Sequence, residues 1–305
     1  MLKQKIKIYE IIKDGTKHGI KIAKQTDKQS YIQYKDLDRR LDEWIDNDQI
    51  DWNNFIEVDQ VEEDLIDQDP RLVEQIQFQH FEIDTWYYSP YPTGKYLYIC
   101  KYCLKYIYNT NTYYGHQAIC RLPLPGKPVY INKNIQINEI DGKIDKLFCQ
   151  NLSLLGKLFI QHKTIYFDIE PFLFYILIVK GKNGREIVGY FSKEKFSPEG
   201  YNLSCIVVFP PYQKKGYGSL LIEFSYELCR VQQTIGGPER PLSDFGIVGY
   251  HSYWKSVLLN LFAENPNIEL TLDECATVTC IKQEDILCTL NLLGFLNQWK
   301  GLMLW

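Results

Sequence analysis

The stretch from Asn202 to Tyr226, NLSCIVVFPPYQKKGYGSLLIEFSY, constrains the fold of this chain more than any other. Apolar side chains alternate along its first part, from Leu203 to Phe209, and β-branched residues are frequent there, which predicts a buried strand. Pro210 and Pro211 end that strand, because proline cannot donate to a β ladder. Apolar residues then recur at helical spacing, at Leu220, Leu221, Phe224 and Leu228. We therefore predict a strand, a tight loop and a helix.

The loop between this strand and this helix reads QKKGYG and contains Gly216 and Gly218. Glycines at such a point allow backbone N–H groups to approach a ligand, and a helix N-terminus adds partial positive charge. This pattern favours a pyrophosphate cradle in which backbone amides supply the shape and the lysines add charge. An ordinary tight turn is the alternative, since a lone glycine loop is weak evidence for a site.

The order of the glycines separates this loop from other phosphate loops. It follows Q-x-x-G-x-G, which is neither the dinucleotide fingerprint nor a Walker loop, and it resembles the acetyl-CoA loop of GNAT-like acetyltransferases. Together with GGPERPLSDFGIVGYHSYW further along, it resembles the MYST family of histone lysine acetyltransferases, over roughly Tyr87 to Gly301. The resemblance implies that acetyl-CoA is the cosubstrate. The residues expected to bind it are Ile206, Val207, Val208, Gln213, Lys214, Lys215, Gly216, Tyr217, Gly218, Ser219, Ser243 and Ser252.

A second motif has the spacing of zinc ligands. Cys100, Cys103, His116 and Cys120 follow the pattern C-x2-C-x12-H-x3-C within residues 96–122. The two residues that are four apart lie on one face of a helix, so all four side chains can converge. Four protein ligands leave no open coordination position, which predicts a structural zinc ion. Chance spacing of buried thiols is the alternative, and the MYST resemblance, which includes a C-C-H-C finger, argues against it.

The other cysteines of the chain have no such partners. Cys205 is treated separately below. We interpret the others as small core residues with reduced thiols, because we see no secretory signal in the chain. They are Cys149, Cys229, Cys275, Cys280 and Cys288.

The resemblance also implies catalytic residues. Without it, Glu239 is a surface glutamate in a proline-bounded loop; PERPLSD resembles the MYST loop that holds the catalytic glutamate. Glu239 is then the base that removes a proton from the substrate lysine, with Cys205 beside it as an acetyl acceptor or a lining residue. LFIQHKTIYFDIEPFLFYIL resembles the segment whose lysine becomes autoacetylated, here Lys163, which otherwise reads as a plain loop lysine.

Residues 1–60 indicate a small β module. YIQYKDLDRRLDEWI resembles the chromo-barrel, or Tudor-knot, module, which implies binding of histone tails or nucleic acid. Tyr31, Tyr34 and Trp44 form a candidate cage for a methylated ammonium, and we favour the alternative that they are the core of the barrel. A helical turn is expected at 38–44.

Charge is unevenly distributed along the chain. The stretch from Asp36 to Asp69 holds 14 acidic and two basic residues, a net −12, so the remainder carries +8 in a chain of net −4. Such a run is usually solvated surface; the other interpretation is a face that attracts basic protein tails.

The predicted organisation is α+β: a chromo barrel at 1–60, an acidic linker at 61–75 and a MYST acetyltransferase domain at 76–305 that includes the zinc finger and a helical C-terminal region. Within it we expect a helix in 147–160, strands at 166–167, 172–179 and 187–191, helices at 249–261, 273–279 and 284–293, and a closing strand at 299–305. The longest apolar run, 171–179, is too short to cross a bilayer.

The predicted function is histone lysine acetylation in the nucleus. The expected partners are histone tails, the nucleosome and the scaffold subunit of a multi-subunit complex, with weak direct DNA binding by the isolated chain. One alternative is a chromatin reader or scaffold with an inactive acetyltransferase domain, against which the intact candidate residues argue. An acetyltransferase for small amines is another, and the zinc finger and barrel argue against it.

Overall fold

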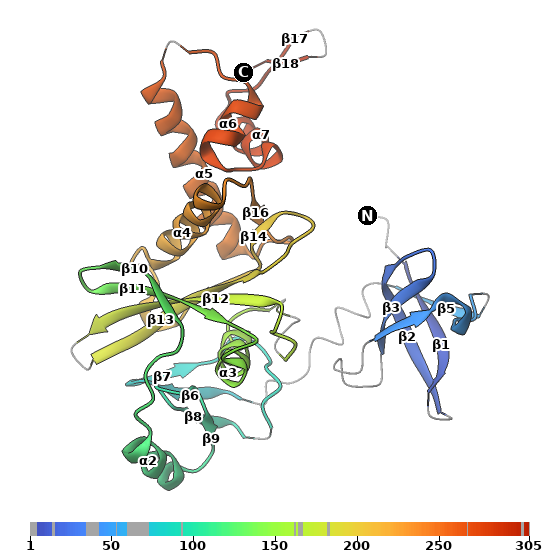
Figure 1. The fold of residues 1–305 in the computed structure, drawn as a ribbon, viewed down its shortest axis with the longest axis vertical. Helices are drawn as coiled ribbons and strands as arrows, with labels where there is room; N and C mark the ends of the chain where they lie inside the picture. Colours follow the sequence, from blue (N-terminus) through green and yellow to red (C-terminus); the bar gives the residue numbers. More distant parts are fainter. Residues whose placement is uncertain are drawn as a thin grey trace. The chain divides into compact units, whose positions relative to one another are not determined.

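A computed structural model of the chain describes residues 5–13, 16–34, 43–52, 54–59, 73–92, 94–161, 163, 167–181, 184–266, 268–299 and 302–304. The chain divides into two compact units, Met1–Arg71 and Leu72–Trp305 (Figure 1). Each unit has its own hydrophobic core and is described by itself.

The first unit is an antiparallel sheet of five strands in the order β4-β3-β2-β1-β5. Isoleucines from four of its strands, together with Ile50, form its core: Ile11, Ile20, Ile32, Ile45 and Ile50. This unit confirms the predicted β-rich module. Its elements are β1 (Lys5–Lys13), β2 (Thr16–Gln25), β3 (Gln29–Tyr34), β4 (Glu43–Asp46), the 3₁₀ turn η2 (Asn47–Gln49) and β5 (Phe55–Asp59).

Two expectations for this unit need correction. Glu43 and Trp44 lie on strand β4, where they pair with β3, and not on a helical turn; 38–42 lies outside the described residues. Trp44 and Tyr31 contact each other with ring centroids 5.5 Å apart, but Trp44 is 46% exposed and neither ring belongs to the isoleucine core. The side chain of Tyr34 lies outside the described residues.

The second unit is built on an antiparallel sheet in the order β10-β11-β12-β13-β15. The β12–β13 pair is the expected hairpin, closed by the pairing of Gly181 with Gly184. The strands are β10 (Lys127–Asn132), β11 (Ile135–Asp141), β12 (Phe172–Gly181), β13 (Gly184–Glu194) and β15 (Cys205–Val208).

Helices cover both faces of this sheet. Tyr190 and Phe191 are neighbours on β13 and so face opposite ways. Tyr190 meets Gly156 of helix α3 (Lys146–Lys157), whereas the ring of Phe191 contacts Phe224 of helix α4 (Tyr217–Gln232). The predicted helix at 147–160 and the predicted helix of the central motif are thus both confirmed, and they pack on opposite sides of the strands that carry the site.

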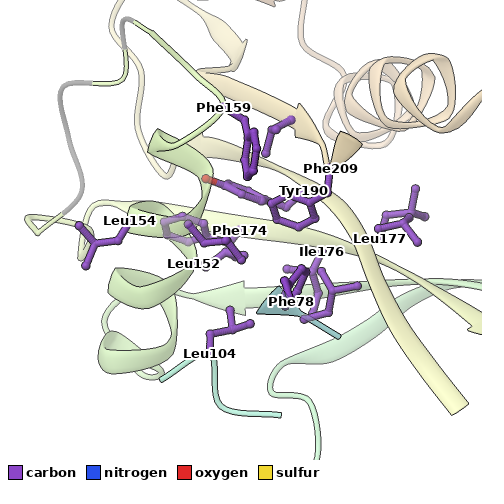
Figure 2. Close-up of a cluster of buried hydrophobic side chains, with 14 of the residues drawn as sticks. Phe78, Leu104, Leu152, Leu154, Phe159, Phe174, Ile176, Leu177, Tyr190 and Phe209 are labelled. Atoms are coloured by element: carbon purple, nitrogen blue, oxygen red, sulfur yellow. The ribbon is translucent and has the colours of Figure 1, made fainter. Parts of the chain in front are cut away.

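A smaller sheet lies below α3 in Figure 1, in the order β7-β6-β8-β9. Figure 2 shows how its side chains join the main core: Phe78 and Leu104 meet residues from α3 and the central sheet, such as Leu152 and Ile176. This sheet is therefore part of the second unit's core and not an appendage. Its strands are β6 (Gln75–Phe78), β7 (Phe81–Asp84), β8 (Tyr96–Ile99) and β9 (Tyr106–Ile107), and helix α2 (Thr110–Ile119) follows β9.

The C-terminal part is helical, as predicted. A second core cluster includes Tyr226, Tyr250, Trp254 and Ile286, and it joins α4 to the later helices. The expected closing strand at 299–305 is instead a two-stranded hairpin that pairs only with itself among the described residues. The elements are α5 (Asp244–Glu264), α6 (Leu272–Thr279), α7 (Gln283–Leu292), β17 (Asn297–Trp299) and β18 (Leu302–Leu304).

Other expectations are also corrected. Phe167 lies in a bend and not in a strand, and Tyr166 lies outside the described residues. Cys149, Cys229, Cys275 and Cys280 are buried as expected, whereas Cys288 is exposed on α7 and is not a core residue.

No helix in the described part of the chain combines the length and apolar character needed to cross a membrane.

Candidate active site

The central strand, predicted as one element from Leu203 to Phe209, is broken at Ser204. Its first part, β14 (Tyr201–Leu203), pairs in parallel with β16 (Gly237–Pro238), while β15 pairs with β13. The Ser204 amide donates to the Ser192 carbonyl at 2.7 Å, and the Glu239 amide donates to the Leu203 carbonyl at 2.8 Å. These two bonds bring Glu239, which follows β16, beside Ser204 and Cys205.

The surroundings of Glu239 change its acidity. The residue is exposed at the surface, yet desolvation by the protein atoms around its carboxyl raises the pKa above the ordinary value. The Ser204 hydroxyl and the Lys163 ammonium oppose this effect, and Glu194 and Glu199 add to it. No hydrogen bond of good geometry links Ser204 to Glu239, since the buried Ser204 hydroxyl has no partner among the described residues. A carboxylate whose pKa is raised is better matched to proton abstraction near neutral pH.

The Glu239 loop is fixed from its other side by Arg240. The Arg240 guanidinium donates to the carboxylate of Asp285 on α7, whose side chain is 3% exposed. Breaking such a pair leaves a buried charge uncompensated.

Sequence reasoning missed both Asp285 and Ser204. Neither belongs to a motif that the residue types alone distinguish, and only the fold places Ser204 near Glu239 and Asp285 against Arg240.

The glycine loop leads directly into the uncapped N-terminus of helix α4. Lys214 and Gly216 have left-handed φ angles of 59° and 83°, and α4 begins at Tyr217 with no side-chain cap. The first amides of a helix have no intrahelical acceptor, so the N–H groups of residues 217–219 point out of the helix end. The Gln213 side chain donates to the Val208 carbonyl at 2.8 Å and holds the loop against β15.

The loop has room for a phosphate group. A Cβ built on Gly216 meets no atom within 4 Å, whereas one on Gly218 would lie 3.9 Å from the Val208 side chain. Open space beside Gly216, next to uncapped amides with a helix dipole behind them, fits the pyrophosphate of acetyl-CoA.

The side chains predicted to contact the cofactor differ in their exposure. Val207 is buried in the core, so only its backbone is available to a ligand, whereas Ile206 and Val208 are half-buried. Tyr217 and Gly218 are also half-buried, and Lys214, Lys215 and Ser219 are exposed. Lys215 turns back on its own loop, where its ammonium donates to the Pro211 carbonyl at 3.0 Å.

The structure does not bring Ser243 and Ser252 together. Ser243 caps α5 by accepting from the Gly246 amide at 3.2 Å, and Ser252 lies exposed further along the same helix. Ser252 follows Ser243 by nine residues, which is about 13 Å along the helix axis. A single ligand group therefore cannot contact both.

Lys163 is more buried than a plain loop lysine. Only 4% of the residue is exposed, and its charge acts on the Glu239 carboxyl. A lysine is rarely this buried without a local reason. The Lys163 ammonium therefore lies near the candidate base.

The four predicted zinc ligands converge. Their ligand atoms lie within 4.8 Å of one another, and Cys103 Sγ is 3.4 Å from His116 Nε2. Cys100 and Cys103 belong to the turn between β8 and β9, and His116 and Cys120 come from the last turn of α2 and its C-terminal cap. Three thiolates and one imidazole fit a structural zinc ion. Leu104, inside the knuckle, is buried in the main core, which couples the metal site to the fold.

We expect the purified chain to contain one equivalent of zinc, and Cys103→Ala to lose it together with most of the soluble protein, because metal binding and folding are coupled. Metal analysis and the soluble fraction after expression measure both effects. Cys288→Ala, which removes an exposed thiol outside the group, is the matched control and should keep both. Zinc-free wild-type protein that is folded would contradict the assignment.

Comparisons with known proteins agree with this arrangement. The MOZ/SAS family model matches residues 123–304, and the model of the MYST family zinc finger domain matches residues 70–120. The chain belongs to the MYST family. A third model, the Tudor-knot, described as the RNA binding activity-knot of a chromodomain, matches residues 4–52 of this MYST chain.

Named relatives are histone acetyltransferases. Histone acetyltransferase MOF of Drosophila melanogaster is 47% identical over 237 residues, which cover 76% of this chain and 29% of that protein. The Tip60 homolog of Caenorhabditis elegans is 45% identical over 76% of this chain and 52% of its own length. Histone acetyltransferase of the MYST family 1 of Arabidopsis thaliana is 36% identical over 95% of this chain and 76% of its own length. The chain thus spans about half of the length of the Tip60 homolog, and less of the length of MOF.

Proposed function

We propose that this chain transfers the acetyl group of acetyl-CoA to the ε-amine of lysines in histone tails. The observation that carries the proposal is the joint placement of Glu239 and Cys205 at the break in the central strand, in the same strand–loop–helix unit as the uncapped loop before α4. Family membership and the names of the relatives support this activity. Rates of acetylation of a histone tail peptide by the purified chain test it.

Acetyl-CoA supplies the thioester carbonyl that the lysine attacks. The Gln213 amide already donates to the Pro210 carbonyl at 3.2 Å, so the amides of residues 214–219 are the ones that hold the pyrophosphate. Ile206, Val207, Val208, Ser243 and Ser252 are further candidate contacts. A free lysine amine has a pKa of ~10.4 and is protonated at neutral pH. Glu239 removes that proton, directly or through a water molecule, and its raised pKa suits this task.

Cys205 lies one residue after the break, half-buried on β15. We favour direct transfer with Cys205 lining the site, over a route in which its thiolate first accepts the acetyl group. Lys163 remains our candidate for autoacetylation.

A second candidate function is a chromatin reader whose acetyltransferase domain is inactive. The contacting pair of Tyr31 and Trp44 outside the barrel core favours a recognition role for the first unit. Two aromatic rings with one exposed face suit a methylated ammonium. Binding of methylated tail peptides without any acetyl transfer would favour this alternative.

The division into a barrel at 1–60, a linker at 61–75 and a catalytic domain at 76–305 remains part of this proposal. Nuclear localisation follows from a chromatin substrate. Most of the acidic stretch from Asp36 to Asp69 lies outside the described residues, so its role as an attractor of basic tails rests on its charge alone.

We expect the isolated chain to acetylate free histones or tail peptides faster than nucleosomes. Binding DNA requires clustered lysine and arginine, whereas the net −12 stretch attracts cationic tails over a Debye length of ~8 Å at physiological salt. A scaffold partner with basic segments should restore nucleosome activity. Turnover on both substrates at matched salt, with and without such a partner, measures this. Equal rates for the lone chain would remove the need for a scaffold.

A further inference from the structure

The turn between β6 and β7 lies against the segment that opens the glycine loop. That segment is the 3₁₀ turn η3 (Pro210–Tyr212), which connects the end of the central strand to the loop. Phe78, before the β6–β7 turn, contacts Phe209 with ring centroids 5.3 Å apart, and both rings belong to the buried cluster of Figure 2. Phe81, after that turn, contacts Tyr212 with ring centroids 5.5 Å apart. Both pairs meet edge to face, so the small sheet supports η3 through favourable aromatic contacts.

The hydroxyl of Tyr212 reaches two acceptors on other elements. It lies 2.9 Å from Gln79 Oε1, in the β6–β7 turn, and 3.1 Å from Glu186 Oε2, on β13. Desolvation by burial and the Glu186 carboxylate raise the pKa of Tyr212. The hydroxyl therefore keeps its hydrogen and acts as a donor. Because it carries a single hydrogen, it donates to one acceptor or to the other at any moment.

The side-chain amide of Gln79 is bonded at both ends. Its Nε2 donates to the Ile187 carbonyl on β13 at 2.7 Å, while its Oε1 faces the Tyr212 hydroxyl. The backbone of Gln79 has a left-handed φ of 59°, which glycine adopts more easily than glutamine. The turn itself therefore does not require a glutamine. The buried side chain instead joins Tyr212 to β13.

The same part of β13 also holds the chain just before η3. Val188, next to Ile187, is an extra residue on β13 where its register with β12 shifts. The Val188 carbonyl accepts from the Phe209 amide at 3.0 Å, and Gly189 then pairs with Val208 of β15. Backbone bonds thus fix the entry into η3. Its last residue is fixed by side chains.

The glycine loop begins where η3 ends. Gln213 follows Tyr212 directly, and its side chain donates to the Val208 carbonyl at 2.8 Å. At the other end of the loop, a Cβ on Gly218 would lie 3.9 Å from the Val208 side chain. A loop this short transmits a shift of Tyr212 to its own backbone. The amides of residues 214–219, which are the candidate contacts of the pyrophosphate, would then be displaced.

We propose that Tyr212 is a positioning residue for acetyl-CoA, whose hydroxyl, held by Gln79 and Glu186, keeps the glycine loop in the shape that receives the pyrophosphate. This inference rests on the proposed role of the loop in binding acetyl-CoA. The hydroxyl is engaged with Gln79 and Glu186, so it acts on the ligand only through the loop. A loop that occupies its binding shape for only part of the time binds more weakly, because the apparent Kd rises as the competent fraction falls.

Calorimetric titration of the full chain with acetyl-CoA tests the proposal. Tyr212→Phe keeps the ring and its contact with Phe81 but removes the hydroxyl, and it should raise Kd about fivefold, the usual effect of one hydrogen bond. Gln79→Met keeps the length of that side chain and should raise Kd only about two- to threefold, because Glu186 still accepts from Tyr212. The double variant should bind as Tyr212→Phe does, since the Gln79 oxygen acts on the loop through the hydroxyl.

Tyr175→Phe is the matched control. Tyr175 is also a buried tyrosine whose hydroxyl donates to a glutamate, Glu139 at 2.7 Å, but the two residues lie on β12 and β11 and do not contact the loop. Its Kd for acetyl-CoA should equal that of the wild type. Steady-state kinetics of Tyr212→Phe should show a raised KM for acetyl-CoA with kcat unchanged, because the hydroxyl acts on cofactor binding and not on the chemical step.

The calorimetric result separates positioning from a loss of stability. A partly unfolded variant binds at fewer sites per chain with the same Kd, whereas a misplaced loop changes Kd itself. An unchanged Kd in Tyr212→Phe, or in Gln79→Met if Tyr212→Phe does not fold, would overturn this inference and leave acetyl-CoA binding by the loop in place. A folded wild-type chain that does not bind acetyl-CoA would overturn the proposed function, and this inference with it.

Discussion

Glu239→Gln is expected to lower turnover of a histone tail peptide by ~10²–10⁴-fold, the usual contribution of a positioned general base. The change keeps the size of the side chain and the bond from the Glu239 amide to the Leu203 carbonyl, so the loop should stay in place. Steady-state kinetics at saturating acetyl-CoA measure the loss, and calorimetry with acetyl-CoA checks that cofactor binding is retained. A turnover within a fewfold of wild type would remove Glu239 from the mechanism.

The pH dependence of activity in the wild type and in Glu239→Gln shows whether Glu239 acts as a base or has only a structural role. The base must be ionised, and desolvation raises the pKa of Glu239, so wild-type activity should fall as pH drops through a value above that of an ordinary glutamate. Glu239→Gln should lose this acidic limb. It should recover part of its activity at high pH, where more of the substrate lysine, with a pKa of ~10.4, is already neutral.

Cys205→Ala distinguishes the two routes of transfer. Under direct transfer it should be milder than Glu239→Gln, because the thiol only lines the site. Equal and complete loss in both variants, with acetyl-CoA binding intact, would favour the acyl-cysteine route.

Gly216→Glu is expected to abolish measurable acetyl-CoA binding. The new side chain would enter the open space beside Gly216 and place a negative charge against the pyrophosphate. Like charges held together cost several kcal/mol, which at 1.4 kcal/mol per tenfold is a loss of ~10²–10³-fold in affinity. Calorimetry on the folded variant measures it.

Two controls isolate the cause of this loss. Gly216 has a left-handed backbone, with φ 83°. Gly216→Ala places a Cβ on that backbone without adding a charge, so it measures the backbone strain alone. Lys215→Glu changes the net charge of the loop by more than Gly216→Glu does. Its charge change, however, falls on a side chain that turns back to the Pro211 carbonyl. We expect Lys215→Glu to bind more tightly than Gly216→Glu, because backbone amides and not lysines shape the cradle. The reverse order would contradict that account.

Local patterns predicted much of the fold. Helical and strand periodicity found α3, α4 and the β12–β13 hairpin, and cysteine spacing found a group whose ligand atoms do converge. These features depend on residues close together in the chain. Alternation also predicted strand character on both sides of Ser204, but not the break itself. That break arises because Leu203 pairs with β16 and Cys205 with β13, and such distant partners leave no local signal.

The same limit applies to the candidate site. Glu239 was found only through resemblance, since a glutamate between prolines has no distinguishing pattern of its own. Asp285, which holds the Glu239 loop through Arg240, lies on α7, 45 residues further along the chain. Burial of Lys163 and exposure of Cys288 and Trp44 are likewise properties of the assembled units.

The most direct test of the proposed activity is acetyl transfer by the purified chain itself. Radiolabelled acetyl-CoA and an unmodified histone tail peptide are incubated with wild-type protein and with Glu239→Gln. Label in the peptide is measured by scintillation counting, and the acetylated product is identified by mass spectrometry. We expect label on lysine ε-amines with wild type and a rate lower by ~10²–10⁴-fold with the variant. A folded, zinc-loaded wild-type chain that binds acetyl-CoA and leaves free histone tails unlabelled would contradict the account.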